Sequence, residues 1–257
     1  MTYLASDLHL EADRPETIRL FLDFLAGPAR EAGNLYLLGD VFEAWIGDDA
    51  PGRLGLEIAE ALRAVSDGGT RLYFMCGNRD FLLGADFCRR AGMVHLEEPH
   101  FIDTADGPAM LLHGDTLCTD DEAYQRFRRK VRNPRWQRRI LARPVWWRGI
   151  LARLARVMSR RHTGSSEALI MDVNTDAVEN AFRHNQVRRI IHGHTHRLAI
   201  HDLQVDQNHC QRIVLGDWNE AGSVLRSDHS GLALMSVARD GGGPIRLRLH
   251  ETAASLR

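Results

Sequence analysis

The chain has 257 residues and a mass of 29.0 kDa, with 44% hydrophobic and 26% charged residues. These values fit one large domain, or one domain with an insertion, and exclude a disordered, collagen-like or low-complexity chain. No apolar run approaches the roughly 20 residues that span a bilayer, and the first residues contain neither a basic n-region nor an apolar signal core, so we expect no signal peptide. The four cysteines, Cys76, Cys88, Cys118 and Cys210, form no C-x-x-C pair, so we expect reduced thiols in the cytoplasm.

The formal net charge of −1 conceals a strong asymmetry. Residues 121–166 contain 14 basic and 2 acidic residues, a local net charge of +12, whereas the rest of the chain carries −13. Such a split indicates an anionic partner at one place on the surface. Nearly all of the cations are arginine, and Lys130 is the only lysine.

The first third of the chain alternates strand and helix patterns. Short apolar runs predict strands, and apolar residues at three- and four-residue spacing predict helices. In chain order we expect a strand at 3–6, a helix at 15–30, a strand at 34–38, a helix at 54–65 and a strand at 71–76. This βαβαβ order predicts an α/β layered fold.

The rest of the chain begins with a strand, changes to basic helices and then returns to strands. After a strand at 109–112 we expect helices at 124–131 and 136–141, a break at Pro144, and a basic amphipathic helix. A polar link at 163–166 and a helix from about 167 to 182 follow. Strands are then expected at 188–191, 198–205, 212–215, 223–226, 232–237 and 245–249. The simplest partition is a core of residues 1–120 and 167–257, interrupted by a basic helical insertion at 121–166.

Five of the predicted strands end at residues that can bind a metal. These residues are Asp7, His9, Asp40, Asn78, His113, His194 and His196. The carboxyl ends of strands in α/β sheets gather where ligands bind, so we expect these side chains to converge. Nitrogen and oxygen donors without a thiolate suit manganese, iron or zinc. Seven donors are too many for one ion but suit two, about 3.5–4 Å apart with a shared carboxylate.

Each of these motifs taken alone also fits an ordinary turn at the end of a strand. A lone histidine is more often a structural residue than a ligand, and only the series of five favours a metal site. His192, His201 and His209 do not fit the ligand spacing, so we expect them to be structural. Trp45 fits either a wall of the site or the core, and the cysteines fit small apolar fillers.

The same motifs carry a resemblance to a known family. Asp7-x-His9, Gly39-Asp40, Gly77-Asn78-Arg79-Asp80, His113-Gly114-Asp115 and Gly193-His194-Thr195-His196 together resemble the calcineurin-like metallophosphoesterase superfamily. Longer strings at 37–49, 77–84, 113–121 and 170–174 resemble its branch of UDP-2,3-diacylglucosamine pyrophosphatases (hydrolases) of lipid A biosynthesis. The resemblance implies a β-sheet sandwich flanked by helices, with 121–166 as an inserted, tryptophan-containing helical lid.

The resemblance also implies a cofactor and a set of site residues. Two Mn²⁺ ions are implied, one held by Asp7, His9, Asp40 and His196, the other by Asp40, Asn78, His113 and His194, with Asp40 bridging. Catalytic roles are implied for Asp40, Arg79 and His194, and substrate contacts for Asn78, Arg79, Asp121, Ser159 and His194. The alternative for Arg79 is an ion pair with Asp80. Relatives carry Asn and Lys where this chain has Thr163 and Ser166, so we expect Arg160 or Arg161 to supply the missing charge.

The implied reaction is hydrolysis of UDP-2,3-diacylglucosamine at the α-phosphorus. The products are UMP and 2,3-diacylglucosamine 1-phosphate (lipid X), and the implied location is the cytoplasmic face of the inner membrane, with the protein bound peripherally. The residues by themselves support only a phosphoester or pyrophosphate hydrolase. The alternatives are therefore a phosphoesterase acting on a soluble nucleotide or phosphoprotein, a nuclease, and a non-catalytic binding module stabilised by metal.

The insertion, with Trp136, Trp146 and Trp147, also fits several roles. It could lie on an anionic membrane surface, cover acyl chains as a lid, bind nucleic acid, or form a helical hairpin with a solvated arginine face. A diacylated substrate with a diphosphate needs both apolar volume and positive charge. We therefore expect the lid and membrane roles, which are compatible, with no nucleic acid and no obligate protein partner.

Overall fold

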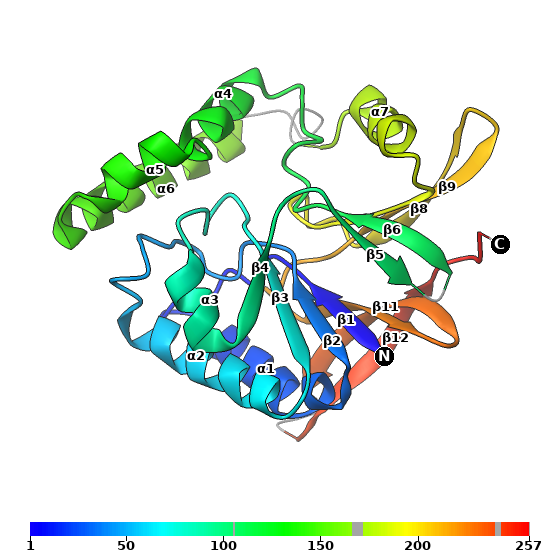
Figure 1. Ribbon diagram of the computed structural model, residues 1–257, viewed down its shortest axis with the longest axis horizontal. Helices are drawn as coiled ribbons and strands as arrows, with labels where there is room; N and C mark the ends of the chain where they lie inside the picture. Colours follow the sequence, from blue (N-terminus) through cyan, green and yellow to red (C-terminus); the bar gives the residue numbers. More distant parts are fainter. Residues whose placement is uncertain (105, 166–171, 240–242, 257) are drawn as a thin grey trace.

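The computed structural model describes residues 1–104, 106–165, 172–239 and 243–256, without the side chains of 157–165 (Figure 1). The strands are β1 (Thr2–Ala5), β2 (Asn34–Leu37), β3 (Arg71–Met75), β4 (Met93–Leu96), β5 (His100–Thr104), β6 (Gly107–Leu111), β7 (Arg189–His192), β8 (Ala199–Val205), β9 (Asn208–Val214), β10 (Gly222–Asp228), β11 (Gly231–Arg239) and β12 (Ile245–Thr252). The helices are α1 (Pro15–Ala26), the short 3-10 helix η1 (Pro28–Glu31), α2 (Gly52–Asp67), α3 (Ala85–Ala91), α4 (Glu122–Val131), α5 (Pro134–Leu141), α6 (Val145–Ser165) and α7 (Thr175–Asn185).

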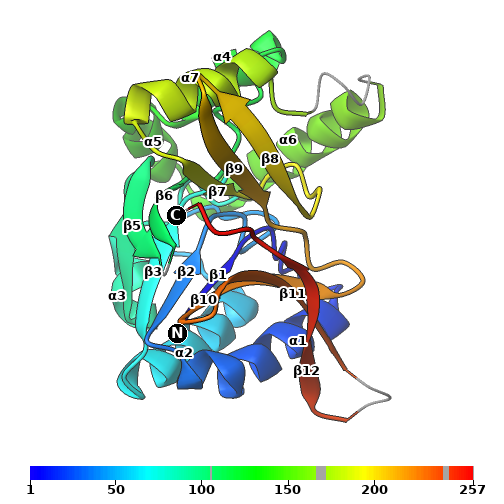
Figure 2. The same cartoon turned by 90° about the vertical axis from the view of Figure 1, so that its right-hand side faces the viewer.

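The strands form two stacked sheets with helices on their outer faces (Figures 1 and 2). The first sheet has the order β12-β11-β10-β1-β2-β3-β4, in which β1 to β4 run parallel. The second has the order β5-β6-β7-β9-β8, in which β6, β7 and β9 run parallel. Helices α1, α2 and α3 cover the first sheet, and α7 packs on the second. The expected layered α/β fold, a β-sheet sandwich flanked by helices, is confirmed.

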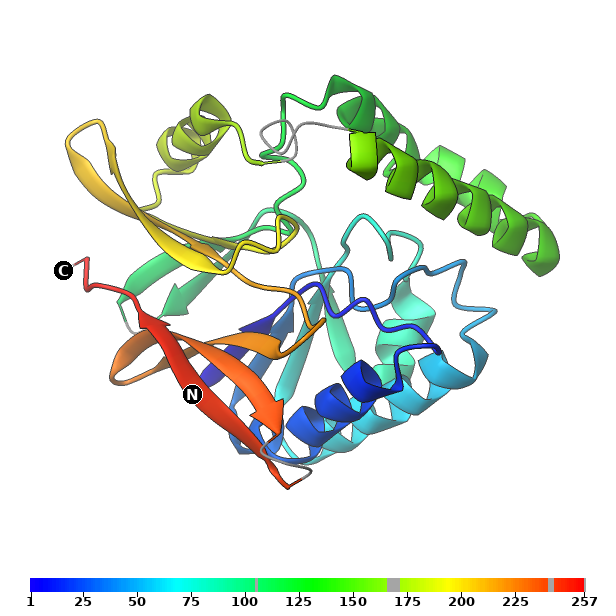
Figure 3. The same ribbon diagram turned by 180° about the vertical axis from the view of Figure 1, so that it is seen from behind.

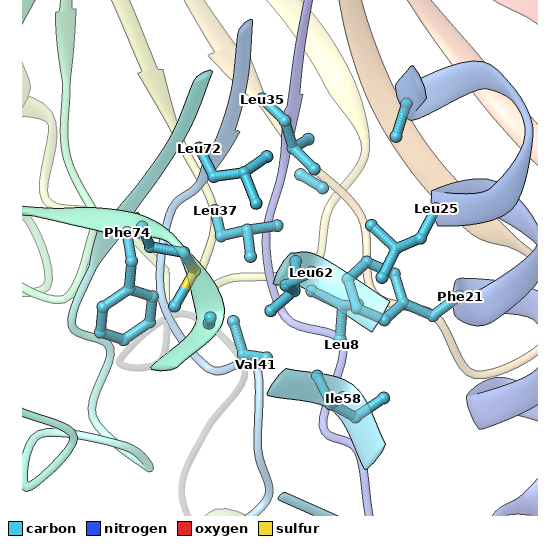
Figure 4. Close-up of a cluster of buried hydrophobic side chains, with 14 of the residues drawn as sticks. Leu8, Phe21, Leu25, Leu35, Leu37, Val41, Ile58, Leu62, Leu72 and Phe74 are labelled. Atoms are coloured by element: carbon cyan, nitrogen blue, oxygen red, sulfur yellow. The ribbon is translucent and has the colours of Figure 1, made fainter. Parts of the chain in front are cut away.

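Side-chain alternation along the strands builds separate apolar layers. Tyr3 and Ala5 pack in the cluster under α1–α3, whereas Leu4 between them packs in the cluster between the two sheets. Figure 4 shows part of the first cluster, where Leu35 and Leu37 of β2 meet side chains from the helices. Both faces of the central strands are therefore buried, which explains their almost continuous apolar sequence. Each fully buried leucine contributes about 1.5–3 kcal/mol.

Hydrogen bonding continues past the ends of the strands into the loops that carry the predicted ligands. Leu38 N donates to Ala5 O at 2.8 Å, and Asp7 N donates to Gly39 O at 3.0 Å. In the second sheet Gly193 N donates to His113 O at 2.8 Å. The two sheets thus present their ligand-bearing loops as ordered extensions of parallel strands.

The insertion leaves and rejoins the core at one place. Asn174 N donates to Leu117 O at 2.9 Å, and the Asn174 amide donates to Asp120 Oδ1 at 2.8 Å. Between these points α4, α5 and α6 lie together at one end of the molecule (Figures 1 and 3). Within the described residues, no helix is both long and apolar enough to cross a membrane.

Some expected element boundaries were wrong. The helix expected at 15–30 ends at Ala26, where Gly27 and Pro28 interrupt it, and η1 follows. Residues 163–165, expected as a link, belong to α6; 166–171 lie outside the described residues. The helix expected from about 167 begins at Thr175, where the side chain of Asn174 caps it. The short elements α3, β4 and β5 were missed.

Trp45 and the cysteines belong to the buried interior. Trp45 is 6% exposed and packs against Phe42 and Phe87, so of its two expected roles the core one holds. Cys76, Cys88, Cys118 and Cys210 are buried free thiols, in agreement with the small apolar fillers expected.

Candidate metal centre

The seven predicted ligands converge where the carboxyl ends of both sheets meet. Single donor atoms of Asp7, His9 and His196 lie within 4.8 Å of one another, and so do those of Asp7, Asp40 and His113. Asn78 Oδ1 lies 2.9 Å from His113 Nε2 and 2.8 Å from His194 Nδ1. Asp40 Oδ2 is 3.9 Å from His9 Nε2 and 3.8 Å from His113 Nε2, so this carboxylate stands between the two histidines.

Both carboxylates are bound on one side only. Asp7 Oδ2 accepts a hydrogen bond from His194 N at 2.9 Å, while Asp7 Oδ1 is buried without a hydrogen bond of good geometry. Asp40 Oδ1 accepts one from Arg79 N at 2.7 Å and leaves Oδ2 facing the imidazoles. A buried, unsatisfied carboxylate oxygen costs free energy unless a cation or a donor meets it.

Three of the imidazoles each have an oxygen partner at Nδ1. His9 Nδ1 lies 2.8 Å from Glu43 Oε2, His113 Nδ1 lies 2.8 Å from Leu38 O, and His196 Nδ1 lies 3.2 Å from Asp217 Oδ2. An oxygen partner at Nδ1 assigns the proton to that nitrogen and leaves the Nε2 lone pair for a metal. The Nε2 atoms of His9 and His196 are only 3.3 Å apart, which is typical of ligands that share an ion.

The backbone is strained at the ligands themselves. Asp7, His9, Asp40, His194 and His196 all have positive φ, between 48° and 68°. This left-handed conformation costs a non-glycine residue about 1–3 kcal/mol and is concentrated at functional sites. Five of the seven predicted ligands therefore hold a conformation that the stable strands on either side impose.

Glycines allow the carboxylates their positions. A Cβ atom on Gly77 would collide with Asp40 Oδ1, and one on Gly193 would collide with Asp7 Oδ2. Neither glycine has a positive φ, so the close approach of the carboxylate, and not the backbone conformation, explains why the residue is glycine.

The charges of the centre favour bound positive charge. Burial lowers the pKa of His196, but Asp217 and Asp7 outweigh it and raise that pKa to about 10. Burial also lowers the pKa of His113, but Asp40 and Asp115 outweigh this effect and raise that pKa to about 9. Burial would raise the pKa of Asp7, yet His196 holds it well below its usual range. A field that binds protons this strongly also suits a divalent cation.

Arg79 lies at the edge of the centre and does not pair with Asp80. Asp80 instead accepts hydrogen bonds from Gly77 N at 2.7 Å and Val41 N at 2.8 Å. The Arg79 guanidinium is 3.9 Å from Glu43 Oε1, and its Nε is buried without a partner among the described residues. The ion-pair alternative for Arg79 is therefore wrong, and the guanidinium retains a donor for a ligand.

The predicted substrate residues of the insertion are only partly described. Asp121 caps α4 by accepting from Tyr124 N at 2.8 Å, and the Tyr124 ring stacks beside His194 with centroids 5.8 Å apart. Asp121 therefore begins a helix that reaches the centre. Ser159 lies in α6, but its side chain and those of Arg160, Arg161 and Thr163 are outside the described part, as is all of Ser166.

Sequence reasoning missed the residues that hold the ligands in place. Glu43 and Asp217 orient His9 and His196, and Asp80 ties the backbone of the Asp40 loop to that of the Asn78 loop. Burial and Asp40 raise the pKa of Asp80 to about 6. The only signal in the sequence was that Glu43 and Asp80 lie within the strings that follow Gly39 and Gly77.

The donor set fits two divalent cations. Every predicted ligand offers nitrogen or oxygen. Among the described residues Asp7 Oδ1 has no hydrogen bond of good geometry, although His196 Nε2 lies 3.3 Å away, and Asp40 stands between His9 and His113. Such a pair, held by a strained and preorganised cluster, defines a metal-dependent phosphoesterase site.

Sequence comparison identifies the family. The model of the calcineurin-like phosphoesterases matches residues 2–198, so the chain belongs to that family. Within it the chain is similar to proteins named UDP-2,3-diacylglucosamine hydrolase. The one from Pseudomonas paraeruginosa is 54% identical over 88% of this chain and 94% of its own length. The one from Stenotrophomonas maltophilia is 47% identical over 93% and 99%.

Similarity to solved structures is more distant. Vps29 from Entamoeba histolytica, solved with zinc, aligns over 97% of both chains with a TM-score of 0.46 and 12% identity.

We predict that Gly193→Ala disrupts the metal centre. The added methyl group displaces the Asp7 carboxylate, so metal affinity falls roughly tenfold or more, and overpacking costs about 1–3 kcal/mol of stability. Gly149→Ala is the control, because a Cβ there would meet no described atom within 4 Å apart from its chain neighbours and the backbone of its own helix. Calorimetric metal titration and thermal unfolding measure both effects; wild-type metal affinity in Gly193→Ala would contradict the role of this contact.

We also predict that Glu43→Gln weakens metal binding roughly 10–100-fold, because the amide is a poorer partner for His9 Nδ1. The fold should persist, since Glu43 contributes to none of the apolar clusters. The matched control is Glu60→Gln, an exposed residue on α2. Equal metal affinity of the two variants would show that Glu43 does not orient the ligand.

Proposed function

We propose that this protein hydrolyses the pyrophosphate of UDP-2,3-diacylglucosamine at the α-phosphorus, releasing UMP and 2,3-diacylglucosamine 1-phosphate. One observation carries the proposal: seven nitrogen and oxygen donors, most of them buried, converge in a chain about half identical, over most of its length, to hydrolases of that name. In this function the protein is a lipid A biosynthetic hydrolase.

The metal ions of the proposal are two Mn²⁺. Asp7, His9, Asp40 and His196 hold one, and Asp40, Asn78, His113 and His194 hold the other. When bound, two such dications supply a water of lowered pKa and neutralise charge on phosphate oxygens. The chain contributes the rest: the Asp40 carboxylate stays fixed by Arg79 N, and Asn78 stays fixed between His113 and His194.

Arg79 binds the substrate in this proposal. Its guanidinium already lies beside the centre, and its buried Nε needs an acceptor. A planar guanidinium pairs well with two phosphate oxygens and thereby orients the diphosphate. Asn78 and His194 at the centre, and Asp121 and Ser159 of the insertion, are the further substrate contacts of this proposal.

The insertion at 121–166 is the lid of the proposed site, attached to a core of 1–120 and 167–257. One face of α6 is fixed to the core: Arg148 is 3% exposed and pairs with Asp49, and Arg156 pairs with Glu11, two residues from His9. Arg156 also acts electrostatically on Glu43, the partner of His9, so it places positive charge beside the centre, whereas Arg148 fixes α6 to the loop around Asp49. The acyl chains then lie between α6 and the core.

The opposite face of α6 fits a membrane surface. Trp146, Ile150 and Leu154 recur at four-residue steps, about half a turn around the helix from Arg148, and are 67%, 50% and 57% exposed. Tryptophan, aliphatic side chains and neighbouring arginines are typical of helices that lie on anionic bilayers. We place the protein on the cytoplasmic face of the inner membrane, where a diacylated substrate resides, bound peripherally.

The proposed reaction is tested by turnover with the authentic substrate. We expect UMP release from UDP-2,3-diacylglucosamine with added Mn²⁺, loss of this activity with a chelator, and slower turnover of the deacylated UDP-glucosamine. Asp40→Ala should reduce turnover to the background rate, because it removes the carboxylate between both sets of ligands. Equal rates on the acylated and deacylated substrates would contradict the lipid substrate and favour a soluble nucleotide.

We predict that exchanging Trp146, Ile150 and Leu154 together for serine weakens binding to phosphatidylglycerol vesicles roughly tenfold or more, since apolar area no longer enters the interface. Sedimentation with vesicles measures this. The control exchanges Val94 and Leu249, which are 56% and 63% exposed on the core, for serine. Membrane binding that survives the α6 changes, or falls equally in the control, would refute the proposed surface.

A further inference from the structure

A cavity opens directly beside the metal centre. It has a volume of about 350 Å³, and its wall includes His196 and Asp217, the ligand and its orienting carboxylate. The rest of the wall comes from Leu198 before β8, from the segment between β9 and β10 with the first two residues of β10, and from Ser236 of β11; no described residue of the insertion lines it. This volume lies at the lower end of the roughly 300–1,000 Å³ typical of small-molecule sites.

The wall of the cavity favours a neutral ligand with hydrogen-bond donors. Asp217 and Glu220 contribute carboxylates, and Ser236 contributes a hydroxyl. The wall contains neither arginine nor lysine, and the described residues show no ion pair to Glu220. A phosphate would be repelled by the carboxylates, and an acyl chain would leave these polar groups without partners.

The segment that forms the wall is held in one shape. The amide of Asn219 donates to Asp217, and Arg14 donates to the Asn219 oxygen. Gly216 N donates to Ser223 Oγ at 2.8 Å, and Ser223 Oγ donates back to Gly216 O at 2.9 Å. A preformed wall reduces the entropy lost when a ligand binds.

We propose that this cavity binds the uridine half of the substrate, an inference that rests on the proposed function. The substrate joins a nucleoside, a diphosphate and a diacylated sugar. The metal centre and Arg79 suit the diphosphate, and the arginines and apolar residues of the insertion suit the other half. The acceptor-rich cavity suits the nucleoside: Glu220 accepts the ribose hydroxyls, as carboxylates do in dinucleotide sites, and the uracil ring lies over Ser236.

The test fills the cavity with a larger side chain placed on β11. Ser236→Trp fills it, whereas Ala238→Trp adds the same ring two residues along the same face of β11 and outside the cavity wall. We expect Ser236→Trp to raise the KM for UDP-2,3-diacylglucosamine and the inhibition constant of UMP roughly tenfold or more. Its Mn²⁺ affinity should stay at the wild-type value, and Ala238→Trp should match the wild type throughout.

A second variant removes the charge without adding bulk. Glu220→Gln should weaken the binding of UMP several-fold but leave the binding of 2′,3′-dideoxy-UMP unchanged. The analogue lacks the hydroxyls from which the carboxylate accepts hydrogen bonds. If the wild type hydrolyses the lipid substrate while Ser236→Trp and Glu220→Gln bind UMP as the wild type does, the cavity is not the nucleoside site. If the wild type does not hydrolyse the lipid substrate but both variants bind UMP more weakly than the wild type, the nucleoside site is supported and the proposed substrate is refuted.

Discussion

The structure depends on two carboxylates in which only one oxygen accepts a backbone hydrogen bond. Asp7 and Asp40 each give one oxygen to a backbone N–H and turn the other toward imidazoles. Burying such charge costs several kcal/mol unless an opposite charge meets it. The cost is compounded by five ligands with positive φ. Only loops fixed to buried parallel strands keep this arrangement, which is why the apolar layers on both sides of β1 and β2 matter to the chemistry.

The insertion is fixed to the same loops that carry the ligands. Arg132 donates to the carbonyls of Cys76 and Gly77, immediately before Asn78, at 2.9 and 3.0 Å. Arg128 pairs with Glu98 at 2.7 Å, and Glu98 in turn accepts from His113 N at 2.8 Å. A displacement of α4 is therefore transmitted to the Asn78 and His113 loops through direct hydrogen bonds. The proposed lid and the metal centre form one connected polar network rather than two independent parts.

Much of the fold followed from the sequence because its signals are local. Parallel strands buried on both faces leave continuous apolar runs, and a ligand two or three residues past such a run is easy to recognise, as with Asp7 and Asp40. Short elements such as α3 and β5 carry too few residues for a period to emerge. The extent of α6 was also missed, because Gly164 and Ser165 read as a link although the helix continues through them.

The supporting residues of the site could not be predicted for a different reason. Asp217 meets His196 only because β10 returns antiparallel beside β1, a pairing that no local pattern reveals. Arg79 likewise keeps its guanidinium for a ligand because Asp80 accepts hydrogen bonds from two backbone N–H groups instead of pairing with it. Such relationships belong to the tertiary structure, whereas the ligand motifs are sequential.

The chemistry of the walls changes from one side of the metal centre to the other. On the side of α6, Arg156 lies near the centre, and the apolar residues of that helix face outward; on the side of β10 and β11, carboxylates and hydroxyls line the cavity. A substrate with uniform polarity would find half of these walls unfavourable. A molecule that carries a nucleoside, a diphosphate and acyl chains in that order meets a suitable partner at each step. Its diphosphate is then placed over the ligands by the binding of both ends, so that binding energy from remote groups fixes the position of the bond to be broken.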